Sequence, residues 1–141
     1  MTNKPSPIIA AAFLLLFTSL SSLYPEQTYP YAKGSYLYVL GKGKPNPGME
    51  NKTQRRSLAR EASILDGKAQ IAAYIHGLRR KSGETIGQSM EKERKIRTRV
   101  IEFIEGVGNG KSRFDEEDNC STILKVNRKT IQRKLKAKEP K

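Results

Sequence analysis

The chain has almost none of the residues from which disulfides, metal sites and histidine-based active sites are built. Its 141 residues include one cysteine, one histidine and no tryptophan. A single cysteine cannot form an internal disulfide, so fold stability must come from a hydrophobic core. One cysteine and one histidine also leave too few soft ligands for a zinc or iron site. Composition therefore argues against a disulfide scaffold and against a transition-metal centre built from this chain.

Acidic residues are also scarce. Fourteen Asp and Glu stand against 27 Lys and Arg, which gives a formal charge of +13. Such a balance is typical of proteins that contact polyanions, namely nucleic acid, anionic lipid headgroups or acidic envelope polymers. Composition alone does not choose among these partners.

Only one long apolar run is present, and it lies near the N-terminus. Lys4 precedes the run at residues 8–17, and the small polar residues TSLSS follow it. This order is typical of a secretory signal peptide. We expect residues 1–22 to be removed and the protein to be periplasmic or secreted, which would separate it from nucleic acid. A retained membrane anchor is the alternative, although the apolar stretch is shorter than the roughly 20 residues that span a bilayer.

The next segments predict an arm, a strand and a turn. Residues 23–34 hold two prolines and three tyrosines without periodicity, so we expect an extended arm. Residues 35–40 (SYLYVL) predict a strand that is apolar on both faces. We expect the following GKGKPNPG to end that strand in a turn, because its spacing matches no phosphate-binding loop.

Residues 53–78 predict the main helix, with Thr53 as its cap and Gly77 in a left-handed turn at its end. Small residues along it suit close approach to a sheet. We expect the buried stripe to consist of Leu58, Ala62, Leu65, Ala69 and Ala72, with Ile64, Ile71, Ile75 and Leu78 beside it and Ala59 and Ala73 also lining it.

The second half predicts another helix and a hairpin. Residues 88–105 carry an irregular apolar stripe opposite a face of mixed charge. Residues 106–115 and 120–127 read as two strands joined by an acidic turn. Asp115 to Asp118 lack EF-hand spacing, so we expect a turn there and no calcium site.

These elements predict an α+β fold, a two-layer sandwich in which a small, mainly antiparallel sheet is covered by two helices in β-α-α-β-β order. We expect the domain to span residues 35–127, with a basic C-terminal tail at 128–141. Asn127 can cap a short amphipathic helix there, with Ile131 and Leu135 four residues apart. A frayed tail is the alternative.

No catalytic constellation is visible. His76 lies near the end of the main helix and Cys120 opens a strand, and we expect both to be structural. We therefore expect no enzyme, no cofactor and no metal. Two basic segments instead suggest contact with an anionic partner, and the candidate residues are Arg79, Arg80, Lys81, Arg128, Lys129, Arg133, Lys134 and Lys136.

Four segments, YLYVLGKGKP, SLAREASILDGKAQIAAYIHGL, ERKIRTRVIEFIEG and NCSTILKVN, occur in an order that resembles the LPP-twenty family of bacterial envelope lipoproteins, which includes flagellar basal-disk components. The resemblance covers residues 35–127. It implies a small α+β domain that is a structural or assembly part of the cell envelope, is often oligomeric and is not an enzyme. The chain departs from the family because no cysteine that could carry a lipid anchor follows the apolar run.

The sequence thus predicts a non-catalytic, exported envelope protein that acts by self-association or by contact with envelope proteins or anionic polymers, with peripheral membrane contact as a further expectation. The alternative is a membrane-anchored or intracellular protein that binds nucleic acid through residues 79–81 and the basic tail.

Overall fold

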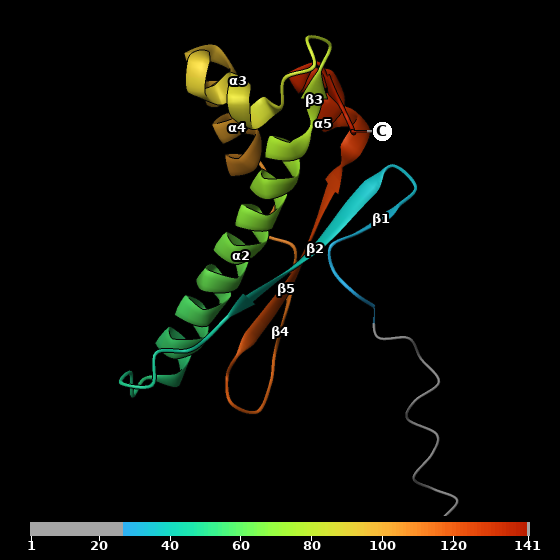
Figure 1. Ribbon diagram of the computed structural model, residues 1–141. Helices are drawn as coiled ribbons and strands as arrows, with labels where there is room; N and C mark the ends of the chain where they lie inside the picture. Colours follow the sequence, from blue (N-terminus) through green and yellow to red (C-terminus); the bar gives the residue numbers. More distant parts are fainter. Residues whose placement is uncertain (1–26, 141) are drawn as a thin grey trace, which may run out of the picture.

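The computed structural model describes residues 27–140, and its elements form an α+β fold, as expected (Figure 1). The predicted signal peptide, residues 1–22, lies outside the described residues, as do residues 23–26 of the predicted arm. The elements in chain order are β1 (Tyr31–Lys33), β2 (Tyr36–Gly43), α2 (Lys52–Gly77), β3 (Arg79–Arg80), α3 (Ile86–Lys92), α4 (Arg94–Glu105), β4 (Lys111–Phe114), β5 (Cys120–Asn127), α5 (Arg128–Leu135) and β6 (Ala137–Lys138).

The main sheet has four antiparallel strands in the order β1-β2-β5-β4. Its two central strands come from opposite ends of the domain, with Val39 directly across from Leu124. Both side chains are fully buried, because alternate residues of a strand share one face and this face is covered by α2. The strand predicted at residues 120–127 is confirmed with its bounds, whereas the strand predicted at 106–115 is shorter.

Helix α2 lies unusually close to β2, and two glycines make this possible. The strand does not end before Gly41 as expected but continues through Gly43. A Cβ atom at Gly41 would lie 1.8 Å from the Ser63 carbonyl oxygen, and one at Gly43 would lie 1.9 Å from the Ala59 carbonyl oxygen. The GKG segment is therefore a site of helix–strand contact and not a turn.

The buried face of α2 differs from the predicted stripe. It consists of residues four apart, and Leu58 and Leu65 are instead 43% and 67% exposed. Ala62, Ala69 and Ala73 are also exposed. The prediction was right for Ala59, Ile71 and Ile75. It was wrong for the central stripe, because the glycines of β2 admit only small residues along the first half of the helix and so select the face that carries Ala59, Ser63 and Gly67. The buried residues are Ala59, Ser63, Gly67, Ile71 and Ile75.

The ends of α2 also differ from the prediction. Asn51 is the cap, and its side chain accepts a hydrogen bond of 3.1 Å from the Gln54 main-chain N–H. Thr53 already lies inside the helix. At the other end Gly77 is helical, and the chain leaves through Leu78 in an extended conformation, with its side chain 1% exposed. The buried Leu78 side chain holds this exit in place.

The second predicted helix is two helices. Thr85 and Gln88 form a reciprocal capping box at the start of α3, and Glu93 adopts an extended conformation between α3 and α4. The pattern at residues 88–105 was irregular because it spans this break. While α2 runs along the sheet, α3 and α4 pack against α2, and α4 also contacts α5 (Figure 1).

The basic segment after residue 127 is built into the fold. Asn127 caps α5 as expected, by accepting a hydrogen bond of 3.1 Å from the Thr130 N–H. Ile131 and Leu135 are 0% and 1% exposed and belong to the main core. Lys136 then takes a left-handed conformation, and β6 pairs with β3. Residues 128–138 thus complete the core at one end of the sheet.

Among the described residues, none of the helices combines the length and the apolar character that crossing a bilayer requires.

Candidate anion-binding site

The pairing of β3 with β6 joins the two basic segments that the sequence analysis singled out. Arg79 lies opposite Lys138 and Arg80 lies opposite Ala137. An open groove of about 1140 Å³ runs along this small sheet and α5. Six of the eight predicted contact residues line it. The complete lining is Arg79, Arg80, Lys81, Ser82, Glu84, Glu93, Lys129, Gln132, Arg133, Lys136, Ala137 and Lys138.

A tight turn after β3 presents Lys81. The Gly83 N–H donates to the Arg80 carbonyl at 3.0 Å, and the Arg80 N–H donates to the Glu84 carbonyl at 2.9 Å. Gly83 has a φ of +88°, a conformation that favours glycine. The turn therefore places Lys81, which is exposed, on the wall of the groove opposite α5.

The two acidic residues of the groove are already paired. Glu93 forms an ion pair with Arg80, and Glu84 forms one with Lys92 at 2.6 Å. The hydrogen bond from Lys92 lowers the pKa of Glu84. Seven basic residues thus face two neutralised carboxylates. Within the described part of the chain, six basic residues of the lining form no ion pair, namely Arg79, Lys81, Lys129, Arg133, Lys136 and Lys138.

The remaining two predicted residues, Arg128 and Lys134, lie outside the groove. Arg128 forms an ion pair with Glu139, which also accepts a 2.6 Å hydrogen bond from the Tyr74 hydroxyl. Burial and this hydrogen bond raise the pKa of Tyr74. The Lys134 ammonium lies 5.8 Å from the centre of the Phe103 ring, beside a smaller hollow. Arg128 therefore holds Glu139, the residue that follows β6, and is not free to bind a partner in the groove.

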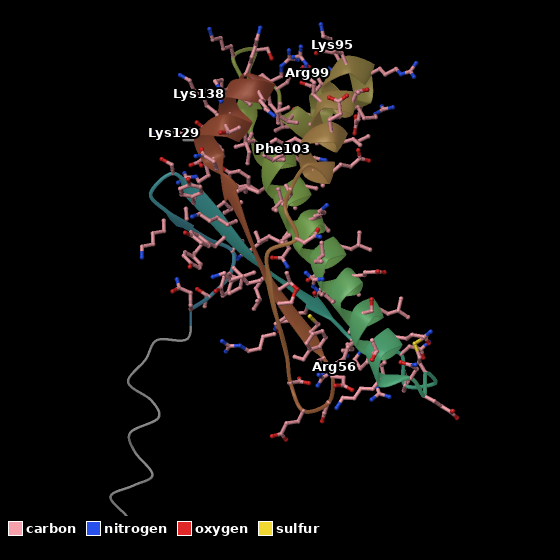
Figure 2. The ribbon with its side chains drawn as sticks, turned by 180° about the vertical axis from the view of Figure 1, so that it is seen from behind. Arg56, Lys95, Arg99, Phe103, Lys129 and Lys138 are labelled. Carbon is pink, nitrogen blue, oxygen red and sulfur yellow. The ribbon has the colours of Figure 1, made fainter. Side chains whose placement is uncertain are left out.

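Positive charge extends beyond the groove. Figure 2 shows Lys129 and Lys138 at the same end of the molecule as Lys95 and Arg99 of α4, with Arg56 at the opposite end. Lys138 was not among the predicted contact residues, because a two-residue strand has no periodicity that could reveal it. Lys95 and Arg99 belong to the face of mixed charge at residues 88–105, which was not among the predicted contact residues.

The two residues considered for catalysis lie apart. His76 is exposed near the end of α2, whereas Cys120 is buried beneath α2, 3.4 Å from the Ser63 hydroxyl. In residues 27–140, no group of three His, Cys, Asp or Glu side chains is arranged to hold a metal ion.

In the acidic turn between β4 and β5, Asp115 bonds within the turn and Asp118 bonds to α2. Asp115 accepts 2.9 Å hydrogen bonds from the main-chain N–H groups of Glu117 and Asn119. Asp118 pairs with Arg55 at 2.7 Å and Arg56 at 2.6 Å, and these hydrogen bonds lower its pKa. The turn is thus held by its own carboxylates.

Comparison of the chain with protein-family models, with curated proteins and with solved structures finds no match.

Proposed function

We propose that this protein is a non-catalytic, exported structural or assembly component of the cell envelope, and that its basic groove binds anionic partners. The observation that supports this most directly is the β3–β6 pairing, which gathers cations from residues 79–81 and 129–138 around one groove. Their separation in the sequence means that only the folded chain presents them together.

The groove suits phosphate or carboxylate groups that lie close together. Arg79 and Arg133 carry planar guanidinium groups that can bind an oxyanion through two parallel hydrogen bonds. Lys81, Lys129 and Lys136 add mobile ammonium groups around the rim. Such a surface fits anionic lipid headgroups or the acidic side chains of an envelope protein, whether another protein or a second copy of this one.

Vesicle binding tests this role of the groove. The variant Lys81→Gln/Lys129→Gln/Arg133→Gln (the groove variant) removes three exposed cations without touching the core. At about 1 kcal/mol per basic residue near an anionic surface, its affinity for phosphatidylglycerol vesicles should fall roughly 100-fold. Cosedimentation at fixed salt measures this fall.

A matched control carries the same charge loss at the other end of α2. The variant Lys44→Gln/Lys52→Gln/Arg60→Gln (the control variant) should bind vesicles within about threefold of the parent, because screened charges far from the contact contribute little. Equal weakening of the groove and control variants would show that net charge alone drives binding and would contradict a role for the groove.

Export is tested separately. The sequence of residues 1–22 and the resemblance to envelope lipoproteins both support it. Fractionation of the native host should recover the protein outside the cytoplasm, and N-terminal sequencing should begin near residue 22 or 23. Recovery of only full-length protein in the cytoplasm would contradict this assignment.

Binding of nucleic acid is the second candidate, because the groove joins the same two segments that this alternative requires. Its signature is affinity for duplex DNA that falls steeply with salt, with a log–log slope near −0.9 for each phosphate neutralised. Tight duplex binding that is lost in the groove variant, together with a cytoplasmic location, would favour this function over the first.

A further inference from the structure

The main sheet has a second face that lies opposite α2. Alternation along β2 turns Leu37 and Val39 toward the helix, with exposed fractions of 5% and 0%. Tyr36, Tyr38 and Leu40 therefore lie on the other face, where Tyr36 is 37% exposed. Among the described elements, α2 is the helix that packs along the sheet, and it lies on one side only (Figure 1). We call the other side the open face.

The strand register orders the open face into four rows, because directly paired residues of antiparallel strands share a face. Each row contains at least one lysine or arginine. In order along β2 the rows are Lys33–Tyr36–Asn127, Tyr31–Tyr38–Lys125, Leu40–Ile123–Lys111 and Lys42–Ser121–Arg113.

The strand residues of this face include five cations and no acid. Asp66 of α2 reaches the sheet edge, where it accepts a 2.8 Å hydrogen bond from the Lys42 main-chain N–H. None of the five cations takes part in an ion pair within residues 27–140. The open face therefore has a continuous positive charge that the described chain leaves unneutralised.

The ring faces of the tyrosines on this face already contact neighbouring side chains. Tyr31 and Tyr38 stack across the β1–β2 pair with centroids 4.9 Å apart and ring planes 7° from parallel, and Tyr29 packs on Tyr31 at 5.1 Å. The Lys125 ammonium lies 3.9 Å from the centre of the Tyr36 ring. The ring edges, which carry the positive part of the aromatic quadrupole, and the hydroxyls remain for contact with a ligand.

We propose that the open face is a second binding surface, distinct from the groove, and that its ligand is an acidic polysaccharide. Carboxylates that recur along such a polymer meet a cation in every row of the sheet, and the tyrosine hydroxyls pair with the sugar hydroxyls. A single-stranded nucleic acid fits less well, because its bases need open ring faces on which to stack. A second copy docked face to face would bring ten cations together.

Titration of the purified full chain with polygalacturonate tests the proposal, because this polymer carries one carboxylate per sugar. The variant Lys42→Gln/Lys111→Gln/Lys125→Gln (the open-face variant) should bind the polymer at least about tenfold more weakly. Each substitution removes a charged hydrogen bond to a carboxylate, and each such bond contributes a sizeable part of the binding free energy. The matched control Arg94→Gln/Lys95→Gln/Arg99→Gln (the α4 variant) loses the same charge on a helix outside both the groove and the open face, and should stay within about threefold of the parent. Neutral dextran should not bind.

A second variant tests the tyrosines with the sheet intact. Tyr31→Phe/Tyr38→Phe keeps both rings and the stack but removes two hydroxyls, so polygalacturonate should bind about three- to tenfold more weakly, with an unchanged thermal midpoint. Unchanged affinity would contradict contact through the hydroxyls.

Three outcomes would overturn the proposal. Equal loss of affinity in the open-face and α4 variants would show that net charge alone drives binding. Tighter binding of poly(dT) than of polygalacturonate, lost in the open-face variant, would assign the face to single-stranded nucleic acid. A dimer in light scattering that the open-face variant abolishes would assign it to a second copy. The vesicle experiment on the groove is independent of all three.

Discussion

The main chain of Gly41 lies directly against the carbonyl of Ser63, so that a methyl group at Gly41 would come within 1.8 Å of that oxygen. Gly43 has the same relationship with Ala59, one helical turn earlier. Gly67 completes the contact from the helix side, since a Cβ there would lie 2.8 Å from a methyl carbon of Leu124. These three glycines set the distance between α2 and the sheet.

Gly41→Ala should therefore be severely destabilising. The added methyl meets backbone on α2, which cannot move without shifting the whole helix, so the loss should reach about 3 kcal/mol or more, at the upper end of overpacking. Urea unfolding followed by circular dichroism measures the change. Gly77→Ala is the matched control, because nothing lies within 4 Å of its added methyl. It should stabilise α2 by up to about 1 kcal/mol; similar effects of both substitutions would contradict the packing.

The cap of α2 provides a second prediction. Asn51→Ala removes the acceptor for the Gln54 N–H and should cost about 1 kcal/mol. Thr53→Ala, at the position favoured by the sequence analysis, should change stability by less than about 0.5 kcal/mol, since Thr53 is an exposed residue within the helix. Thermal melts of the two variants decide between the caps, and a larger effect at Thr53 would rule out Asn51.

A third prediction concerns the segment after residue 127. Ile131→Ala leaves a cavity in the core and should cost about 2 to 5 kcal/mol. Arg133→Ala, on the exposed side of α5, should change stability by less than about 0.5 kcal/mol. The midpoints of urea unfolding measure both stability changes, provided that the m-value is the same as in the parent. An Ile131→Ala variant as stable as the parent would mean that α5 does not pack on the core.

Acid sensitivity is the fourth prediction. Hydrogen bonds from Arg128 and then Tyr74 lower the pKa of Glu139 below its usual 4.5. Because the folded chain binds this proton more weakly than the unfolded chain, the carboxylate stabilises the fold above pH 4.5, and this contribution is lost as the pH falls. Glu139→Gln should thus lower the free energy of unfolding at pH 7, by less than about 1 kcal/mol because the ion pair is partly exposed. Thermal melts across pH should show that the difference from the parent shrinks toward pH 3. A difference that does not change with pH would contradict the pairing.

Local patterns in the sequence predicted several elements well. Alternating apolar residues at 120–127 gave the bounds of β5, and Asn127 ahead of a four-residue apolar spacing indicated the start of α5. Both are short-range signals, set by strand periodicity and by hydrogen bonding within one helical turn. The break at Glu93 escaped notice because charged residues continue across it and neither glycine nor proline marks it.

The candidate site was predictable in its parts but not as a whole. The clusters around Arg80 and Arg133 are visible in the sequence, yet nothing local indicates that they meet. Their meeting depends on β3 and β6, strands of two residues each that are too short for any periodicity. They are positioned by the buried side chains of Leu78 and Leu135 on either side.

By itself, the sequence determined the α+β class, the strong positive charge, the central strands and most helix positions, because these follow from composition and from short-range periodicity. The tertiary structure alone decided that Leu58 and Leu65 lie outside the buried face of α2, since Gly41 and Gly43 of β2 admit only small side chains along the first half of the helix. It alone also joined the two basic segments in one groove and left a tyrosine- and lysine-bearing sheet face open, because both features arise from pairing between strands far apart in the chain.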